Sequence, residues 1–167
     1  MGRRWYLDAS ALAKRYATEK GTPLLNHLFN QVPRRDMMCL TLGTLEVISI
    51  FVRKMNGGQL SPAAFNQVMT DFRDEILDTP DLGKVSATDA LVESTIPLIP
   101  KHSLNATDGV ILRSALDIHA QLRQGGDSLV LITSNQRLLK AAQAEGLATF
   151  DPEAQSQADL DALLASP

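Results

Sequence analysis

Short apolar runs alternate along this chain with segments whose apolar residues recur at the helical spacing of three or four. The apolar runs fall at residues 4–8, 37–40, 129–133 and 147–150, with a shorter one near 83–86. Their length and their bounding polar or glycine residues are typical of buried strands. Strands that alternate with helices predict an α/β fold, in which helices cover both faces of a mostly parallel sheet.

Two of the helical segments lead to specific expectations. The segment from Thr41 to about Lys54 is rich in apolar residues at the helical period, and we expect these side chains to face the core. They are Leu42, Leu45, Ile48, Val52 and Met55. Residues 88–99 predict a single helix that ends at the Pro97–Pro100 segment, followed by a loop.

The length of 167 residues indicates one domain, 1–167, which is long enough to bury a core. We place the main fold at about 4–152 and a short C-terminal helix within 153–167. The formal net charge of −3 argues against a protein that coats nucleic acid non-specifically, because such proteins are normally basic. It does not exclude a nuclease, since carboxylates that hold a metal ion add negative charge away from the contacts with nucleic acid.

The pattern indicates neither a membrane segment nor an export signal. No apolar window approaches the roughly 20 residues of a membrane-spanning helix. Lys14 and Arg15 interrupt the first apolar stretch before the core of a signal peptide could form. The single cysteine, Cys39, excludes an internal disulfide. We therefore expect a cytoplasmic protein with no membrane partner.

Three carboxylates stand in apolar surroundings at the ends of predicted elements. Asp8 directly follows the first strand, Glu46 is the only charged residue between positions 42 and 52, and Asp108 lies in the first turn of its helix. Each has a structural alternative, because aspartate caps helices well and acids near a helix start interact favourably with its dipole. The local pattern leaves Asp8 and Asp108 undecided, whereas the apolar surroundings of Glu46 favour a partner or a metal.

Considered together, the three carboxylates indicate a metal site. In α/β folds, sites form at the carboxyl ends of strands. Clustered carboxylates raise one another's pKa unless a cation lies between them. Oxygen ligands suit Mg²⁺ or Mn²⁺, which retain water, bind substrate phosphates and assist attack on a phosphodiester. The sequence therefore predicts that Asp8, Glu46 and Asp108 bind a divalent metal ion.

Four short motifs in series resemble the PIN-domain family, and the VapC-type toxin ribonucleases in particular. They are Tyr-Leu-Asp-Ala-Ser-Ala at 6–11, Leu-Glu-Val at 45–47, His-Ser-Leu-Asn-Ala-Thr-Asp at 102–108 and Leu-Ile-Thr-Ser-Asn-Gln-Arg-Leu-Leu at 131–139. The resemblance implies a three-layer α/β/α sandwich and a Mg²⁺- or Mn²⁺-dependent endoribonuclease, the toxin of a toxin–antitoxin pair. It also implies an RNA substrate, an antitoxin partner and a homodimer.

The catalytic set that the resemblance implies is Asp8, Glu46, Asp108 and position 135, and here the chain departs from the family. The usual fourth aspartate is Asn135, which offers an oxygen and hydrogen bonds but no charge. This keeps an alternative open: a catalytically impaired PIN domain that binds RNA or a protein. Asp151 is a poorly placed substitute. A phosphoacceptor domain of the receiver type ranks last, because its paired acids and its lysine are missing.

Polar side chains near the predicted site form the candidate substrate-binding set. They are Ser10, Lys14, Arg15 and Ser134. The serines could hydrogen-bond the carboxylates or a phosphate, although serine is also a natural helix cap. The two cations could meet RNA phosphates, although most surface cations are only solvated. The same two alternatives apply to Arg113, Arg137 and Lys140.

Overall fold

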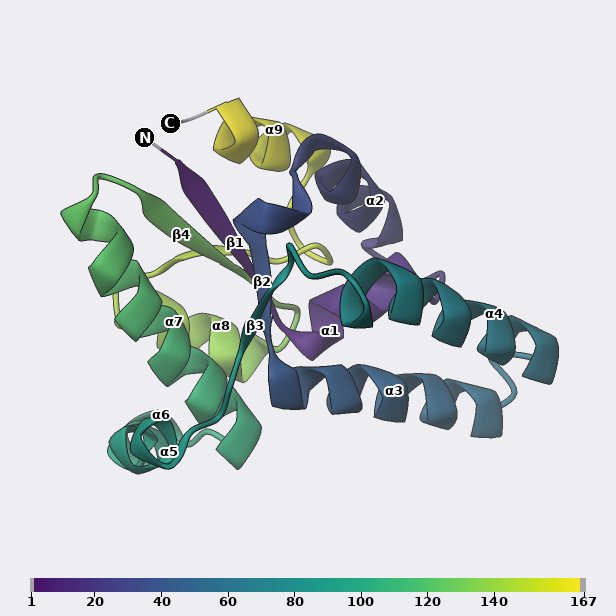
Figure 1. Ribbon diagram of the computed structural model, residues 1–167, viewed down its shortest axis with the longest axis horizontal. Helices are drawn as coiled ribbons and strands as arrows, with labels where there is room; N and C mark the ends of the chain where they lie inside the picture. Colours follow the sequence, from purple (N-terminus) through teal and green to yellow (C-terminus); the bar gives the residue numbers. More distant parts are fainter. Residues whose placement is uncertain (1, 166–167) are drawn as a thin grey trace.

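The computed structural model describes residues 2–165, and in this part of the chain five strands form one parallel sheet of order β3-β2-β1-β4-β5 (Figure 1). The strands are β1 (Arg3–Leu7), β2 (Met37–Leu40), β3 (Gly83–Val85), β4 (Ser128–Ile132) and β5 (Ala148–Phe150). The predicted parallel sheet is therefore confirmed. Residues 1, 166 and 167, which the predicted domain limits include, lie outside the described residues.

Helices cover both faces of the sheet. They are α1 (Ala9–Leu12), α2 (Thr22–Gln31), α3 (Thr41–Asn56), α4 (Pro62–Phe72), α5 (Asp89–Thr95), α6 (Leu98–His102), α7 (Ala106–Gln124), α8 (Gln136–Ala144) and α9 (Gln157–Ala165). Two 3₁₀ turns, η1 (Ala13–Arg15) and η2 (Arg34–Asp36), and a π-helical turn, η3 (Arg73–Leu77), join them. The architecture is the predicted three-layer α/β/α sandwich (Figure 1).

The side chains of the central strands alternate between two apolar cores. On β1, Trp5 and Leu7 belong to one core, and Tyr6 belongs to the other. Residues 129–132 on β4 alternate in the same way. Helices α1 to α4 and α9 contribute to the first core, and α5 to α8 contribute to the second. Because successive side chains of a strand point to opposite faces, the central strands supply apolar contacts to the helical layers on both faces of the sheet.

Two expectations about helices are wrong. On α3, Leu42, Leu45 and Val52 are 43%, 59% and 37% exposed, and only Ile48 of the expected stripe packs against the core. The helical period indicates an apolar stripe but does not say what covers it. The single helix expected at 88–99 is two helices, α5 and α6, which meet at Pro97. Proline has no N–H to continue the hydrogen-bond ladder, so the first helix ends there.

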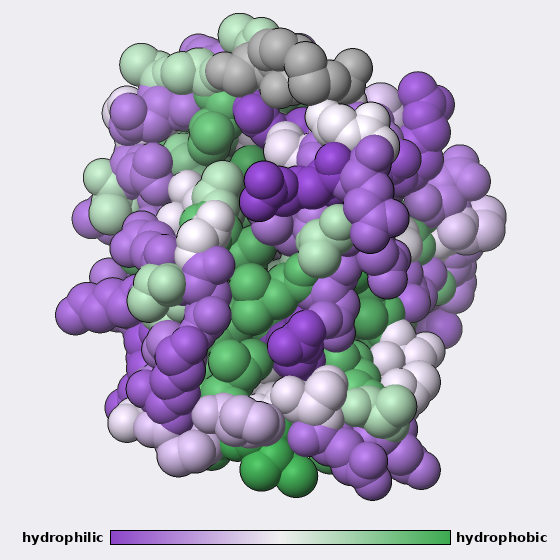
Figure 2. All heavy atoms as spheres, turned by 90° about the vertical axis from the view of Figure 1, so that its left-hand side faces the viewer, coloured by the Kyte–Doolittle hydropathy of each residue, from purple (hydrophilic) through white to green (hydrophobic). Residues whose placement is uncertain are grey.

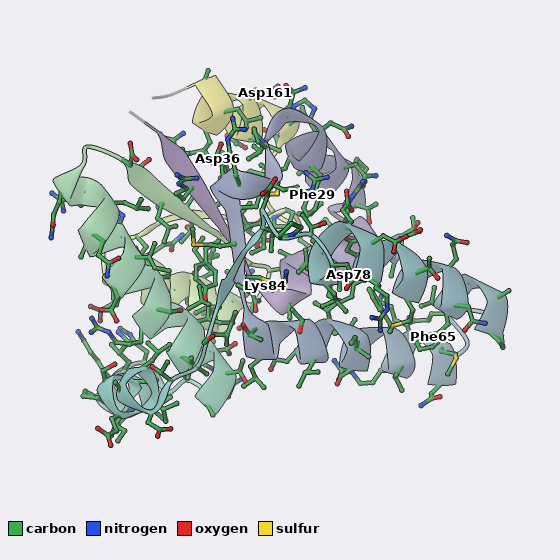
Figure 3. The ribbon with its side chains drawn as sticks, viewed as in Figure 1. Phe29, Asp36, Phe65, Asp78, Lys84 and Asp161 are labelled. Atoms are coloured by element: carbon green, nitrogen blue, oxygen red, sulfur yellow. The ribbon has the colours of Figure 1, made fainter. Side chains whose placement is uncertain are left out.

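The predicted C-terminal helix is present as α9, which packs against the first core through Leu160. Asp161 on α9 lies beside α2 (Figure 3), with its Oδ1 atom 2.9 Å from Nε2 of His27. No helix within residues 2–165 combines the length and the apolar character needed to cross a membrane.

The strand order positions a site. From β1 the chain steps to β2 and then to β3 on one side, and it later crosses back to place β4 on the other side of β1. The connections that leave the carboxyl ends of β1 and β4 therefore cover opposite faces of the sheet. A crevice forms at such a switch point, outside the strand ends. Asp8 follows β1 and Asn135 follows β4 closely, so both lie at this crevice.

Candidate active site

Asp8 is held firmly at the end of β1. Its backbone N–H donates to the Ile132 carbonyl oxygen, which continues the pairing with β4. Its Oδ1 atom accepts from the Ala9 N–H at 2.7 Å and caps α1. Its Oδ2 atom accepts from the Ser10 hydroxyl at 2.7 Å and from the Thr133 hydroxyl at 2.9 Å. The cap predicted as an alternative is real, and the same carboxylate also faces the site.

Ser10 and Thr133 connect the ends of the two central strands. The Ser10 hydroxyl accepts from the Ser134 N–H at 3.1 Å, and the Thr133 hydroxyl accepts from the Asn135 N–H at 3.0 Å. Because both hydroxyls also donate to Asp8, the turn after β4 and the turn after β1 are fixed relative to each other. Asp8 is only 4% exposed, and this network compensates its burial.

The three predicted carboxylates line one cavity of about 340 Å³ at the switch point. Asp8 reaches it from the end of β1, Glu46 from the first half of α3 and Asp108 from the first turn of α7. Asn135 also lines this cavity, which we call the acidic cavity. Residues separated by as much as 127 positions in the sequence therefore share one hollow. Its other lining residues are Ala9, Ser10, Ser49, Ile50, Arg53 and Asn105.

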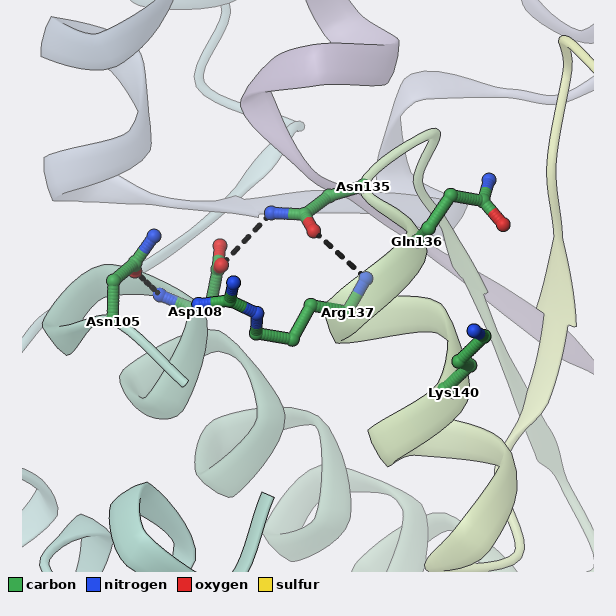
Figure 4. A pocket seen from close by; sticks show the side chains of 6 residues that line it. All are labelled: Asn105, Asp108, Asn135, Gln136, Arg137 and Lys140. Atoms are coloured by element: carbon green, nitrogen blue, oxygen red, sulfur yellow. Dashed lines mark hydrogen bonds between the residues drawn. The ribbon is translucent and has the colours of Figure 1, made fainter. Parts of the chain in front are cut away.

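Asp108 is oriented by two asparagines (Figure 4). The Asn105 side chain caps α7 by accepting from the Asp108 N–H at 2.8 Å. The Asn135 Nδ2 atom donates to Asp108 Oδ2 at 2.8 Å. The Asn135 Oδ1 atom accepts from the N–H groups of Arg137 and Leu138, at 3.1 and 3.3 Å, and so caps α8.

Both cavity carboxylates on helices are easier to protonate than usual. Burial raises the pKa of Asp108 to about 6, with a further contribution from the negative charges of Asp8 and Glu46, against the opposing hydrogen bond from Asn135. Burial likewise raises the pKa of Glu46, and the charge of Asp8 adds to this against a hydrogen bond with Thr107. The predicted mutual repulsion is therefore present, and a cation in the cavity would relieve it.

The donor set fits a hard divalent cation that retains part of its water shell. No three His, Cys, Asp or Glu side chains within residues 2–165 form a group that could hold a metal ion by themselves. Mg²⁺, however, is usually bound through one or two carboxylates together with waters and substrate phosphates. Asp8, Glu46 and Asp108 offer carboxylates of this kind around one cavity, and their repulsion favours a cation.

Comparisons with known proteins support the fold. No protein-family model matches this chain, and no curated protein sequence matches it. The crystal structure of PAE2754 from Pyrobaculum aerophilum aligns with a TM-score of 0.63 at 18% identity, over 99% of this chain and 100% of that one. This chain has a PIN-like fold.

Two further solved structures have the same PIN-like fold. FitAcB from Neisseria gonorrhoeae aligns with a TM-score of 0.58 at 15% identity, over 90% of this chain and 99% of that one. A toxin–antitoxin complex from Klebsiella pneumoniae aligns with a TM-score of 0.53 at 16% identity, over 88% and 96% of the two chains. At these identities the likeness concerns the fold.

The predicted substrate-binding residues lie in different surroundings within the PIN-like fold. Ser10 lines the acidic cavity, and the Ser134 Oγ atom is buried without a hydrogen-bond partner among the described residues. Lys14 is only 4% exposed, and its ammonium group pairs with Glu19 and Glu153. A cation committed to two carboxylates is poorly available to a phosphate.

Arg15 donates to Glu75 and Asn26 and does not line the acidic cavity. The substrate-binding role of Arg15 and Lys14 stays a prediction. Asp151, the suggested substitute for a fourth acid, is buried and accepts from the side chain of Gln136 and the Glu153 N–H, and it does not line the cavity either.

Several residues of this site were not predicted, and Thr133, Asn105 and Arg53 are the most informative of them. Thr133 directly follows β4, and nothing in the sequence distinguishes its hydroxyl from that of other threonines at strand ends. The signal for Asn105 was visible, because asparagine directly before a helical segment is a common cap. Arg53 lies seven residues after Glu46, which places both on the same face of a helix two turns apart. That spacing could have identified it.

Proposed function

We propose that this chain is a metal-dependent endoribonuclease of the VapC type, the toxin of a toxin–antitoxin pair. The observation that carries this proposal is the convergence of Asp8, Glu46 and Asp108 on one cavity at the switch point of the sheet. The PIN-like fold supports it, because solved structures with this fold include a toxin–antitoxin complex.

The reaction is hydrolysis of a phosphodiester. The oxygen of a water molecule bonds to phosphorus, the bond from phosphorus to the leaving sugar oxygen breaks, and that oxygen takes a proton from solvent. Glu46, which lines the acidic cavity beside Asp8 and Asp108, accepts the proton of the attacking water on its carboxylate. Asp8, fixed by its hydrogen bonds from Ala9 and Ser10, keeps the site in position.

Asp8 and Asp108 would be the main ligands of Mg²⁺ or Mn²⁺, with Glu46 acting directly or through a water molecule, and the bound ion would neutralise phosphate charge and make water more acidic. Asn135 keeps Asp108 in place through its Nδ2 atom. Its Oδ1 atom is already used to cap α8, so Asn135 contributes orientation, and the three carboxylates contribute the charge.

The decisive experiment compares cleavage of a structured RNA in Mn²⁺ by the wild-type protein and by Asp8→Asn. We expect the variant to lose more than roughly 100-fold in rate, because even the outer partners of metal ligands contribute 10- to 100-fold. Glu93→Ala, which removes an exposed carboxylate on α5, is the matched control and should cleave normally. Equal cleavage by wild type and Asp8→Asn would contradict the proposal, as would the absence of cleavage by wild type.

A second function is favoured by Asn135. In this alternative the domain has lost catalysis and binds RNA or a protein only. Wild-type protein that binds RNA but cleaves none in Mg²⁺ or Mn²⁺ would support this alternative. Calorimetric titration with Mn²⁺ adds an independent readout, because an enzyme of the proposed kind binds the ion and Asp8→Asn weakens that binding.

An antitoxin and a second copy of the chain are the proposed protein partners. The antitoxin is expected to lie against the helices near the acidic cavity and to block it. Co-expression with the product of a neighbouring small reading frame should yield a complex that no longer cleaves RNA. For the homodimer, the supporting observation is exposed apolar surface on α3 and at the end of α5, where Leu45 on α3 is 59% exposed and Ile96, which follows α5, is 65% exposed.

A further inference from the structure

The acidic cavity is the middle one of three connected cavities. On one side it shares Asn105, Asp108 and Asn135 with a cavity of about 610 Å³ that α7 and α8 line. On the other side it shares Ser10, Ile50 and Arg53 with a cavity of about 310 Å³ that η1 and α3 line. The three cavities therefore adjoin one another in a row from α8 to the second half of α3, and we call this row the groove.

The cations along this groove fall into two groups. Lys14 and Lys54 both pair with Glu19, so their charges are compensated. Arg53, Arg137 and Lys140 form no salt bridge within residues 2–165, although the charges of Arg53 and Arg137 act from a distance on Glu46 and Asp108. These three, which we call the groove cations, lie on both sides of the acidic cavity: Arg137 and Lys140 on α8, and Arg53 on α3.

The two groove cations on α8 are arranged to meet an anion. They are three residues apart and therefore lie on the same face of the helix. Arg137 donates one hydrogen bond, from Nη1 to the Ser103 carbonyl oxygen at 3.0 Å, which leaves its other N–H groups available. Figure 4 shows both side chains at the same cavity as Asp108. The positive charges of Arg137 and Lys140 would therefore compensate phosphate groups that lie beside the acidic cavity. Phosphates directly over the carboxylates would instead be repelled.

The groove offers no surface on which bases could stack. None of the residues that line the three cavities within residues 2–165 is aromatic. Proteins that hold single strands through their bases use aromatic side chains for this purpose. The remaining means of recognition is charge along the phosphate backbone, which carries little sequence information.

We propose that the groove binds one RNA strand by its phosphates, with Arg137 and Lys140 on one side of the scissile bond and Arg53 on the other. The inference rests on the proposed function, because it assumes RNA as the ligand of the same site. It replaces Lys14 and Arg15 with Arg53, Arg137 and Lys140 as the phosphate-binding cations. The strand crosses the acidic cavity between its two points of attachment.

The test is binding of a fluorescein-labelled single-stranded RNA of roughly 12 nucleotides, within the usual site sizes for single strands. Fluorescence anisotropy is measured in EDTA, where the proposed enzyme does not cut, at several KCl concentrations. Each phosphate contact contributes a slope of about −0.7 in log K against log salt, which corresponds to about fivefold in affinity at 0.1 M salt. We expect about fivefold weaker binding for Arg53→Gln and about 25-fold weaker binding for the double variant Arg137→Gln/Lys140→Gln.

The matched control for the double variant is Arg35→Gln/Arg123→Gln, which removes the same charge. Arg35 precedes β2, at the edge of the sheet opposite the site, and Arg123 lies in the last turn of α7, whose first turn carries Asp108. We expect the control to bind like wild type and to keep its salt slope. Equal losses in the control and the double variant, or unchanged binding in both, would overturn the inference.

Cleavage in Mn²⁺ separates this inference from the proposed function. If the groove cations act only by holding RNA, their variants raise KM and leave kcat nearly unchanged, because such binding is equal in ground and transition states. A wild-type protein that binds RNA through these cations but does not cleave refutes the enzyme and supports the groove. If cleavage is lost in Asp8→Asn but RNA affinity is unchanged in the variants of Arg53, Arg137 and Lys140, the proposed enzyme is supported and the RNA-binding groove is refuted.

Discussion

Asn135 determines how much charge the site carries. Both polar atoms of its side-chain amide are hydrogen-bonded: Oδ1 caps α8, and Nδ2 donates to Asp108. An aspartate could cap the helix equally well, but it would place a second carboxylate against Asp108 Oδ2, with no proton to donate. The asparagine therefore lowers the repulsion inside the cavity and leaves three carboxylates for a cation.

At the same scale, we predict that Asp108→Asn stabilises the metal-free protein at pH 7. The pKa of Asp108 is raised to about 6 in the folded protein, against 3.8 ordinarily, so the folded state holds its proton more tightly than the unfolded chain. Stability therefore falls as pH rises from about 4 to 6, and the cost is complete above that window. The asparagine removes this cost and can still accept from Asn135.

Urea unfolding in EDTA measures the effect of Asp108→Asn. We expect a gain of about 1 to 3 kcal/mol at pH 7, on the basis of 1.36 kcal/mol for each pH unit between the two pKa values, and almost none near pH 4. Asp81→Asn, an exposed loop residue, serves as the control and should change little at either pH. A variant less stable than wild type at pH 7 would show that Asp108 is not destabilised in the folded state.

Whether the role of a site residue can be predicted from the sequence depends on how far along the chain its hydrogen-bond and ion-pair partners lie. Asp8, Glu46 and Asp108 were identifiable because each borders apolar sequence near an element end, and strand ends meet at one edge of a parallel sheet. The ion pairs of Lys14 could not be predicted from the sequence, since one of its partners, Glu153, is 139 residues away. The role of Thr133 likewise depends on a contact with Asp8 across two neighbouring strands.

Among the elements, the π-helical turn η3 is joined to η1 and η2 by one of its side chains. Glu75 on η3 accepts from Arg15 of η1, from the Tyr16 hydroxyl and from Arg34 of η2. Both arginines also lie over the ring of Phe29 (labelled in Figure 3), at 5.2 and 4.5 Å from its centroid. One carboxylate thus holds together segments that come before and after β2.

We predict that Glu75→Gln destabilises the protein by about 1 to 3 kcal/mol at pH 7, because it leaves two half-buried guanidinium groups without a counter-charge. Burial opposes the charge of Glu75, but the hydrogen bonds from Arg15 and Tyr16 outweigh it and lower the pKa of its carboxyl. The wild-type advantage is therefore present above the ordinary pKa of glutamate and is lost as pH falls through the lowered value.

The measurement for Glu75→Gln is the free energy of unfolding in urea at pH 7 and at pH 3.5. Asp74→Asn removes the neighbouring exposed charge and should shift it by less than about 0.5 kcal/mol. We expect Glu75→Gln and wild type to converge at the lower pH. A constant difference at both pH values would mean that shape and not charge explains the effect.

The positions of the helices and strands were largely predictable from the sequence. Which face of a helix is buried was harder to predict. The four longer apolar runs are strands close to their expected limits, because strand length and bounding turn residues are local properties. The apolar stripe of α3 is a local property too, but its burial depends on what packs against it. The break at Pro97 is explained by the missing N–H of proline, which ends α5. Proline is well tolerated where a helix begins, so α6 can start directly after it.

For the whole molecule, alternation of strands and helices was enough to predict the fold class, whereas the strand order was not in the pattern. The order β3-β2-β1-β4-β5 is decided by which face each connection covers, and that choice depends on packing between distant segments. The resemblance in four motifs supplied what periodicity could not. Its implied sandwich was confirmed, while its implied ribonuclease activity, metal and homodimer stay predictions.

The exposed apolar residues have a consequence at this scale. Leu42, Leu45 and Val52 on α3 are exposed, as are Val92 on α5 and Ile96 directly after it. Both helices lie along the lower edge of the molecule in Figure 1, and Figure 2 shows apolar atoms at the lower edge of the adjacent face. Large apolar side chains that are exposed on a small domain are candidates for an interaction surface.

We predict that a second copy of the chain covers this surface, so that wild-type protein has twice the mass of one chain in light scattering after size exclusion. Leu45→Asp and Ile96→Asp should each give monomers, because a charge at the centre of an apolar interface is left without a partner. Both side chains are mostly exposed in the single chain, so thermal unfolding should change little. Gln121→Asp, on the exposed side of α7, should remain dimeric. A monomeric wild type would refute the homodimer, and dimeric Leu45→Asp and Ile96→Asp would place its interface elsewhere.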